Sequence, residues 1–395
     1  MRIPGGRRLG TVLALGMAQT LAWGSTYYLP AILAAPMARE YGVSSDWVFG
    51  AFSASLLLSA LVGPAAGRRI DRFGGRDVLT VSSLTFAAGL ALMAASGSFV
   101  TLAAGWLLIG LGMGMGLYEA AFAALASIYR ENARGAITGI TLLAGFASTI
   151  CWPISAYLDA EIGWRATCYV WAGAHLLLGL PLNRFSIPAT VAREAPPPHA
   201  TADSDVSLFN RPMLLMATSF AITWFVSTAM AAHLPSLLEK AGASRTMAIT
   251  AAALVGPAQV AARILEFTLL QRIHPLLSAR IASVTHPVGA LAFLGFGVPA
   301  AYFFALLHGA GNGVMTIAKG TLPLVIFGPG GYGRRQGLLA MPSRISQALA
   351  PFAFAVLFER YGEYALLASS ALCLIGFAAM ISLRAAPVRK TPASP

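Results

Sequence analysis

Long apolar runs recur along the whole chain and leave little polar sequence with which to coat a soluble core. A helix needs about 20 apolar residues to cross a bilayer, and runs of that length follow one another almost from end to end. Only 11% of the residues are charged, against about 25% in soluble domains. The sequence therefore predicts an all-α polytopic membrane protein embedded in a lipid bilayer.

We predict twelve transmembrane helices, each a largely apolar segment bounded by charges or turn residues. Basic residues precede the first run, as in a signal peptide, but that run is too long for one and eleven more follow. The predicted spans are 9–36, 46–67, 77–97, 99–128, 135–158, 166–184, 211–236, 246–270, 279–298, 300–327, 337–358 and 364–384.

The distribution of Lys and Arg predicts the orientation. Of the 27 basic residues, nineteen fall in loops on the side of the N-terminus, five in the opposite loops, and three within spans. Because cytoplasmic loops carry the excess of positive charge, both termini are expected in the cytoplasm. The net charge of +12 is then spread over many loops, so we expect no nucleic-acid partner. The basic inner loops suit a bacterial inner membrane.

The chain repeats itself at a period near 200 residues. L-V-G-P-A occurs at 61–65 and again at 254–258, and glycine-rich ladders occur at 110–116 and 309–313. These repeats predict a duplicated six-helix half, in residues 1–184 and 211–395, with the halves related by an axis along the membrane normal. Residues 185–210 are expected to form a Pro-rich cytoplasmic linker.

The loop between the second and third spans reads G-R-R-I-D-R-F-G-G-R. It resembles the signature cytoplasmic loop of the major facilitator superfamily (MFS), G-x-x-x-D-R-x-G-x-R. The matching residues are Gly67, Asp71, Arg72, Gly74 and Arg76. The resemblance implies the MFS fold, secondary transport by alternating access, and a gating role for this loop. Asp71 is expected to pair with basic groups or a helix N-terminus of the other half and hold the inner face shut.

Two opposite charges occupy equivalent positions in the two halves. Glu119 lies in the fourth span and Lys319 in the tenth, and a charge near the bilayer centre costs at least roughly 2.5–3.5 kcal/mol. In the family that the loop resembles, helices 1, 4, 7 and 10 line the central cavity, so the two side chains would face each other. Lys319 would hold an anionic group of the substrate, while Glu119 would bind a proton or compete for Lys319. The alternative is a static ion pair between two helices.

Arg344 in the eleventh span is a further cation, which either joins this cavity or snorkels to its inner mouth. Two cations against one carboxylate favour an organic anion as cargo. Aromatic and polar residues of the first and seventh spans complete the expected substrate and proton cavity: Gln19, Trp23, Tyr27, Trp224 and His233.

Arg263 and Glu266 come after Pro257 with the three-residue spacing that Arg68 and Asp71 have after Pro64, but without the glycines. They resemble a worn copy of the loop motif near the inner end of the eighth span. Three residues apart, they share one helix face and are expected to neutralise each other, with a role in transport as the alternative.

No nucleotide-binding loop, catalytic triad or metal-ligand spacing occurs, and the three cysteines show no paired spacing. We therefore predict a monomeric secondary transporter, not an enzyme, with no cofactor. It is expected to move a small organic solute, an anion by preference, with proton coupling. A proton-driven multidrug or metabolite efflux pump is the alternative, although the fifth span lacks the G-P-x-x-x-G-G pattern of many such exporters. A membrane sensor on the same fold and a channel fit less well.

Overall fold

The computed structural model describes residues 5–188, 210–269 and 273–383, and every regular element in these ranges is helical. Most of the predicted linker, residues 189–209, lies outside the described residues. Eight helical stretches are long and apolar enough to cross a membrane. Two of them, Phe99–Ser186 and Tyr332–Ser382, continue through turns and contain several of the predicted spans, while the first predicted span is not among the eight.

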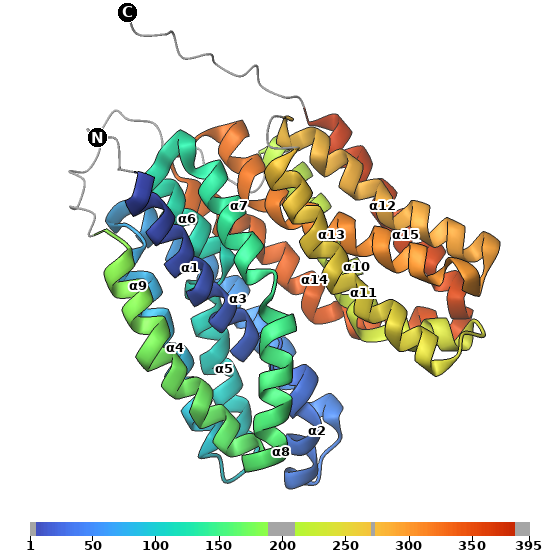
Figure 1. Ribbon diagram of the computed structural model, residues 1–395, viewed down its shortest axis with the longest axis horizontal. Coiled ribbons are helices and arrows are strands. Elements are labelled where there is room, and N and C mark those ends of the chain that lie inside the picture. Colours follow the sequence, from blue (N-terminus) through green and yellow to red (C-terminus); the bar gives the residue numbers. More distant parts are fainter. Residues whose placement is uncertain (1–4, 189–209, 270–272, 384–395) are drawn as a thin grey trace, which may run out of the picture.

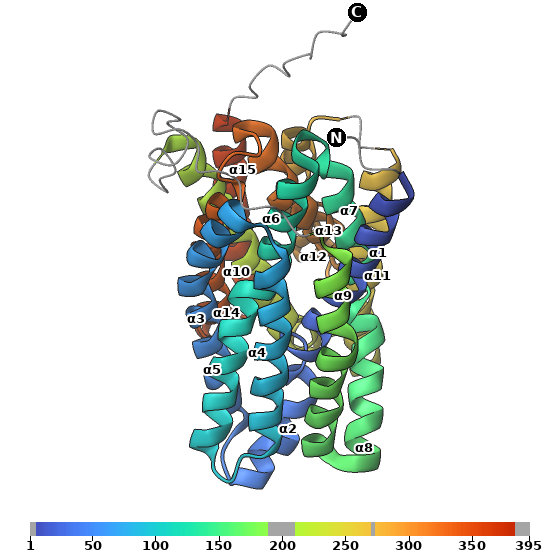
Figure 2. The same ribbon diagram turned by 90° about the vertical axis from the view of Figure 1, so that its left-hand side faces the viewer.

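The helices form two groups, seen as two bundles in Figure 1, and Figure 2 views the molecule from the side of the N-terminal group. The N-terminal group contains α1 (Gly5–Ser25), α2 (Pro30–Tyr41), α3 (Ser45–Phe73), α4 (Arg76–Ala94), α5 (Phe99–Gly116), α6 (Tyr118–Tyr129), η1 (Arg130–Asn132), α7 (Ala133–Ala144), α8 (Ala147–Ala174), η2 (His175–Gly179) and α9 (Leu180–Ser186). The C-terminal group contains α10 (Arg211–Lys240), α11 (Arg245–Thr268), α12 (Pro275–Phe296), η4 (Val298–Ala300), α13 (Ala301–Phe327), α14 (Tyr332–Tyr361), η5 (Gly362–Tyr364) and α15 (Ala365–Ser382). We call the end where α1 begins and α15 ends the terminal end, and the opposite end the far end (Figure 1).

Three predicted spans are interrupted, which corrects the expectation of continuous helices. The first is broken at residues 26–29, directly before Pro30, which has no N–H to continue the helix. The fourth is broken at Leu117, whose backbone is extended, and the fifth at residues 145–146. The break at Leu117 places Glu119 in the first turn of α6, where the partial positive charge of a helix N-terminus favours a carboxylate.

The two groups meet mainly along α3 and α14, with α6 and α7 packed against α11, α13 and α14. The contact between α3 and α14 is made of backbone. A Cβ atom on Gly67 would overlap the carbonyl of Gly333, and one on Gly337 would lie 2.5 Å from the carbonyl oxygen of Gly63. Only residues without a side chain permit the two helices to come this close.

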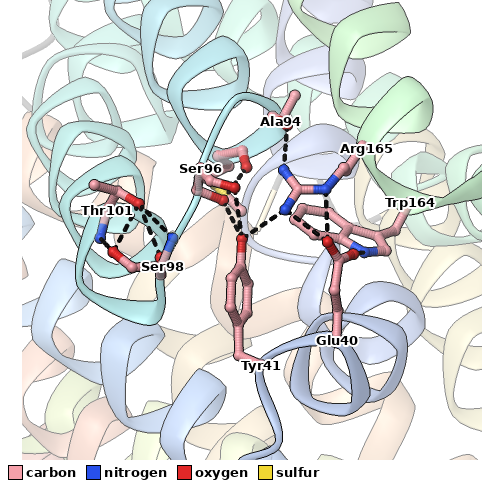
Figure 3. Close-up of polar contacts among 9 residues, drawn as sticks. Glu40, Tyr41, Ala94, Ser96, Ser98, Thr101, Trp164 and Arg165 are labelled. Atoms are coloured by element: carbon pink, nitrogen blue, oxygen red, sulfur yellow. Dashed lines mark hydrogen bonds and ion pairs between the residues drawn. The ribbon is translucent and has the colours of Figure 1, made fainter.

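A polar cluster ties helices of the N-terminal group together at the far end (Figure 3). The guanidinium of Arg165 lies 2.7 Å from the Glu40 carboxylate, and Trp164 Nε1 donates to the same carboxylate at 2.6 Å. Arg165 also donates to Tyr41 Oη at 2.9 Å. The hydrogen bond from Arg165 holds the pKa of Glu40 below its usual value. The cluster therefore joins α2 to the kinked helix α8 through a charge that is stable at neutral pH.

Candidate functional site

A buried carboxylate joins the two groups of helices midway along the molecule. Lys319 Nζ lies 2.6 Å from Glu119 Oε1, and Arg344 Nη2 lies 3.3 Å from Glu119 Oε2. The residues come from α13, α14 and α6, and they are 4%, 2% and 9% exposed. The structure thus brings together the three charged residues predicted to line the cavity, with both oxygens of Glu119 occupied. We call Glu119, Lys319 and Arg344 the central triad.

Each cation of the triad also lies over an indole ring. Lys319 Nζ is 5.1 Å from the ring centre of Trp224, and the Arg344 guanidinium carbon is 5.6 Å from that of Trp23. A cation over an aromatic face gains about 0.5–2 kcal/mol, more when it is desolvated. The two predicted tryptophans therefore flank the triad, one from each group of helices.

The other predicted lining residues lie at different distances from the triad. Gln19 Nε2 donates to the carbonyl of Gly116 at 2.7 Å and so satisfies the end of α5. Tyr27 Oη accepts a hydrogen bond of 2.8 Å from Gln347, whose Oε1 accepts from Arg344 at 3.1 Å. Tyr27 is thus one hydrogen-bonded step from the triad.

His233 is not brought to this site. Its Nε2 lies 2.9 Å from the carbonyl oxygen of Pro351, and its ring packs against Phe354 within the C-terminal group. It is nine positions beyond Trp224 on α10, towards the far end.

Several neighbours of the triad were not predicted. Tyr118 packs on Trp23 with ring centres 4.8 Å apart, and Gln336 Nε2 donates to the backbone carbonyl of Lys319 at 2.9 Å. Gln347 links Arg344 to the N-terminal group. Its spacing, three residues after Arg344 on one helix, was the available signal in the sequence.

Arg263 and Glu266 do not pair with each other, which corrects the expectation for these two residues. Arg263 Nη1 donates to the carbonyl of Thr141 on α7 at 3.1 Å. Glu266 forms an ion pair with Arg134 at 3.4 Å and accepts from Ser278 at 3.0 Å. The physical reason is that the two ends of α7 bring a backbone carbonyl to Arg263 and a guanidinium to Glu266 across the interface.

The loop of the sequence motif lies at the terminal end. Asp71 accepts two hydrogen bonds of 2.8 Å, from the backbone N–H groups of Gly333 and Arg334 in the first turn of α14. The carboxylate therefore caps a helix of the other group, where both the N–H groups and the helix dipole favour a negative charge.

Three further residues of the motif, Gly74, Arg76 and Arg72, make their contacts within the N-terminal group. Gly74 has φ 81°, a left-handed conformation that suits glycine, and it ends α3. Arg76 Nε donates to the carbonyl of Arg184 at 2.7 Å, and the Arg72 guanidinium lies over the ring of Phe73. Gly67 provides the close approach to α14 described above.

Within the described ranges, no group of three or more His, Cys, Asp and Glu side chains is placed to hold a metal ion.

A family model described as Major Facilitator Superfamily matches residues 15–306, well over half of the chain. A search of curated proteins found no significant match.

Among solved structures, the chain is similar to the human organic anion transporter MFSD10 (TETRAN), with a TM-score of 0.70 and 19% identity over 96% of this chain and 100% of that one. It is also similar to the proton:xylose symporter XylE, with a TM-score of 0.74 and 11% identity over 96% of each chain. The transporter FucP in its outward conformation gives a TM-score of 0.74 and 13% identity over 93% of this chain and 97% of that one. The chain belongs to the major facilitator superfamily and is a multi-pass membrane protein with the fold of its transporters.

Proposed function

We propose that this protein is a secondary transporter that moves a small organic anion by alternating access, with the central triad as its binding site. The observation that carries the proposal is the charge of the triad: two buried cations share one carboxylate, across the interface that must open. Buried charge is costly unless it is compensated, and a bound anion would supply the missing negative charge. At 11–19% identity, the solved relatives support the fold and not the cargo.

The cargo would compete with Glu119. An anionic group entering between Lys319 and Arg344 would take over hydrogen bonds that the Glu119 carboxylate now accepts. The released carboxylate, in a desolvated site, would then gain by taking up a proton. This exchange would couple the anion to a proton without any further group.

The contacts of Asp71 support a gate at the terminal end. Its bonds to the first turn of α14 join the two groups of helices, and they must break when that end opens. With the termini in the cytoplasm, as the distribution of basic residues predicts, this gate would close the inner face. We further propose that the protein is a monomer, because one chain supplies both sides of the site. The basic inner loops suit a bacterial inner membrane, which we propose as its location.

Counterflow in proteoliposomes tests the proposal, with a panel of labelled organic anions and cationic dyes outside and unlabelled compound inside. We expect exchange of an anion, its loss in Lys319→Ala, and retained exchange with no response to a pH gradient in Glu119→Gln. Lys240→Ala, which changes an exposed lysine at the far end, is the matched control and should behave as the wild type.

Exchange of dyes alone, with Lys319→Ala unaffected, would reject the anion site and favour the efflux pump. Binding of an anion without any flux would favour a sensor built on the same fold.

A further inference from the structure

Arg263 is a buried cation without a carboxylate partner. Its side chain belongs to a residue that is 5% exposed, and none of the ion pairs among the described residues includes it. Its nitrogens donate to Thr141 O at 3.1 Å, Thr316 Oγ1 at 3.4 Å and Gln259 Oε1 at 3.4 Å. Its Nε has no hydrogen-bond partner in the structure. A buried guanidinium in this state has unused capacity to bind an anion.

The end of a helix partly compensates this charge in the present conformation. Thr141 lies in the last turn of α7, which ends at Ala144, so its carbonyl belongs to the negative end of the helix dipole. Gly145 makes the contact possible, because a Cβ atom there would overlap Arg263 Nη1. Thr141 and Arg263 belong to different groups of helices, so this compensation is lost when the groups separate.

Arg263 is also close to the central triad. Thr316, which accepts from Arg263, precedes Lys319 by three residues on α13, a rise of about 4.5 Å on the same helix face. Gln259, which also accepts from Arg263, and Asn312, which bonds Thr316, are only half-buried. The triad residues, by contrast, are buried. Arg263 and the central triad therefore lie at neighbouring levels of one interface.

Three buried cations, Lys319, Arg344 and Arg263, thus lie at neighbouring levels of the interface, and two of them already share the Glu119 carboxylate. The other buried carboxylate of this interface, Glu266, is already paired with Arg134. We propose that Arg263 forms a second anion subsite next to the triad, and that the cargo is a compact organic dianion, such as a small dicarboxylate. This inference rests on the proposed function, since it adds a second subsite to the same cargo.

Matched carboxylates test the second subsite, with succinate as the dianion and its monoamide, succinamate, as the monoanion of similar length. Binding is measured by the ligand-induced rise in melting temperature of the purified full-length protein, and transport by inhibition of counterflow. We expect the wild type to bind succinate about tenfold more tightly than succinamate, the size of one charged hydrogen bond. Arg263→Gln should remove most of this difference while binding succinamate as the wild type does.

The retained binding of succinamate shows that Arg263→Gln is folded, and Arg263→Lys, which keeps the charge, should recover part of the preference. Lys240→Ala is the control, because it removes an exposed cation at the far end and should leave the preference for succinate unchanged. Equal binding of the two compounds by the wild type would overturn the inference, as would an equal loss of both in Arg263→Gln. If neither compound binds or exchanges, the proposed function itself fails for this class of anion.

Discussion

Both oxygens of the Glu119 carboxylate are occupied by cations from the other group of helices. Removing one partner of such a buried pair costs about 3–5 kcal/mol, since an uncompensated charge remains. A ligand that replaces a partner avoids this cost. At the scale of single residues, the triad is therefore a site where exchange of partners is favourable and simple loss of a partner is not.

The exposed pair of Arg165 and Glu40 makes a contrasting prediction for stability. The two side chains are 33% and 41% exposed, so the pair contributes at most about 1 kcal/mol. Because the pKa of Glu40 is lower in the folded protein, this stabilisation is present above the unfolded-state pKa of about 4.3 and is lost as the pH falls through the folded-state value. Arg165→Gln should lower the melting temperature at neutral pH and have a smaller effect near pH 3.5.

Arg360→Gln serves as the control, because Arg360 lies exposed at the far end over the ring of Tyr361. A melting-temperature difference for Arg165→Gln that stays constant between the two pH values would contradict the prediction.

The sequence identified the members of the triad because a charge inside an apolar run is visible without a structure. It did not separate His233 from them, since a histidine near the end of a span carries no information about its depth. The partners of Arg263 and Glu266 could not be predicted from the sequence either. Spacing along one helix predicts a pair three residues apart, whereas the observed partners lie on α7, more than 120 positions away in the sequence.

At the scale of elements, hydropathy predicted the long apolar helices but not where helices break. The predicted first span ran through Pro30, and Leu117 and the residues at 145–146 lie within apolar runs whose hydropathy does not change. These breaks depend on tertiary partners, such as Gln19, which binds the carbonyl that the break frees at Gly116. The division at residues 184 and 211 stays a prediction, as does the linker between them.

The close contact between α3 and α14 predicts that a methyl group added at Gly67 will favour opening of the terminal end. Gly67→Ala would place a Cβ atom against the carbonyl of Gly333, so it should shift the population towards a state with the terminal end open. Electron–electron distance measurements between spin labels at Arg69→Cys and Leu277→Cys report this opening, because both positions are exposed near that end.

Gly10→Ala is the matched control, since a Cβ atom there meets nothing within 4 Å. The same distance distribution in Gly67→Ala and in the parent would show that α3 and α14 tolerate the methyl group.

For the whole molecule, the polar contacts between the two groups are unevenly distributed. They extend from Asp71 at the terminal end to the contact of Ser53 with the carbonyl of Ala348. Farther towards the far end, no hydrogen bond or ion pair joins the groups in the part of the chain that the structure describes. The two bundles diverge in the same direction (Figure 1), so this is the conformation with the terminal end closed.

The central charges are divided unequally between the halves: Lys319, Arg344 and Arg263 belong to the C-terminal group and Glu119 to the N-terminal group. Separating the groups without cargo means pulling opposite charges apart in a poorly solvated interior, whereas a bound anion would travel with the cations. An empty carrier should therefore reorient more slowly than a loaded one. We expect labelled anion to leave proteoliposomes faster when unlabelled anion is present outside than when it is absent, and equal rates would contradict this. The arrangement of these four side chains would then make the exchange of one anion for another faster than the net release of an anion.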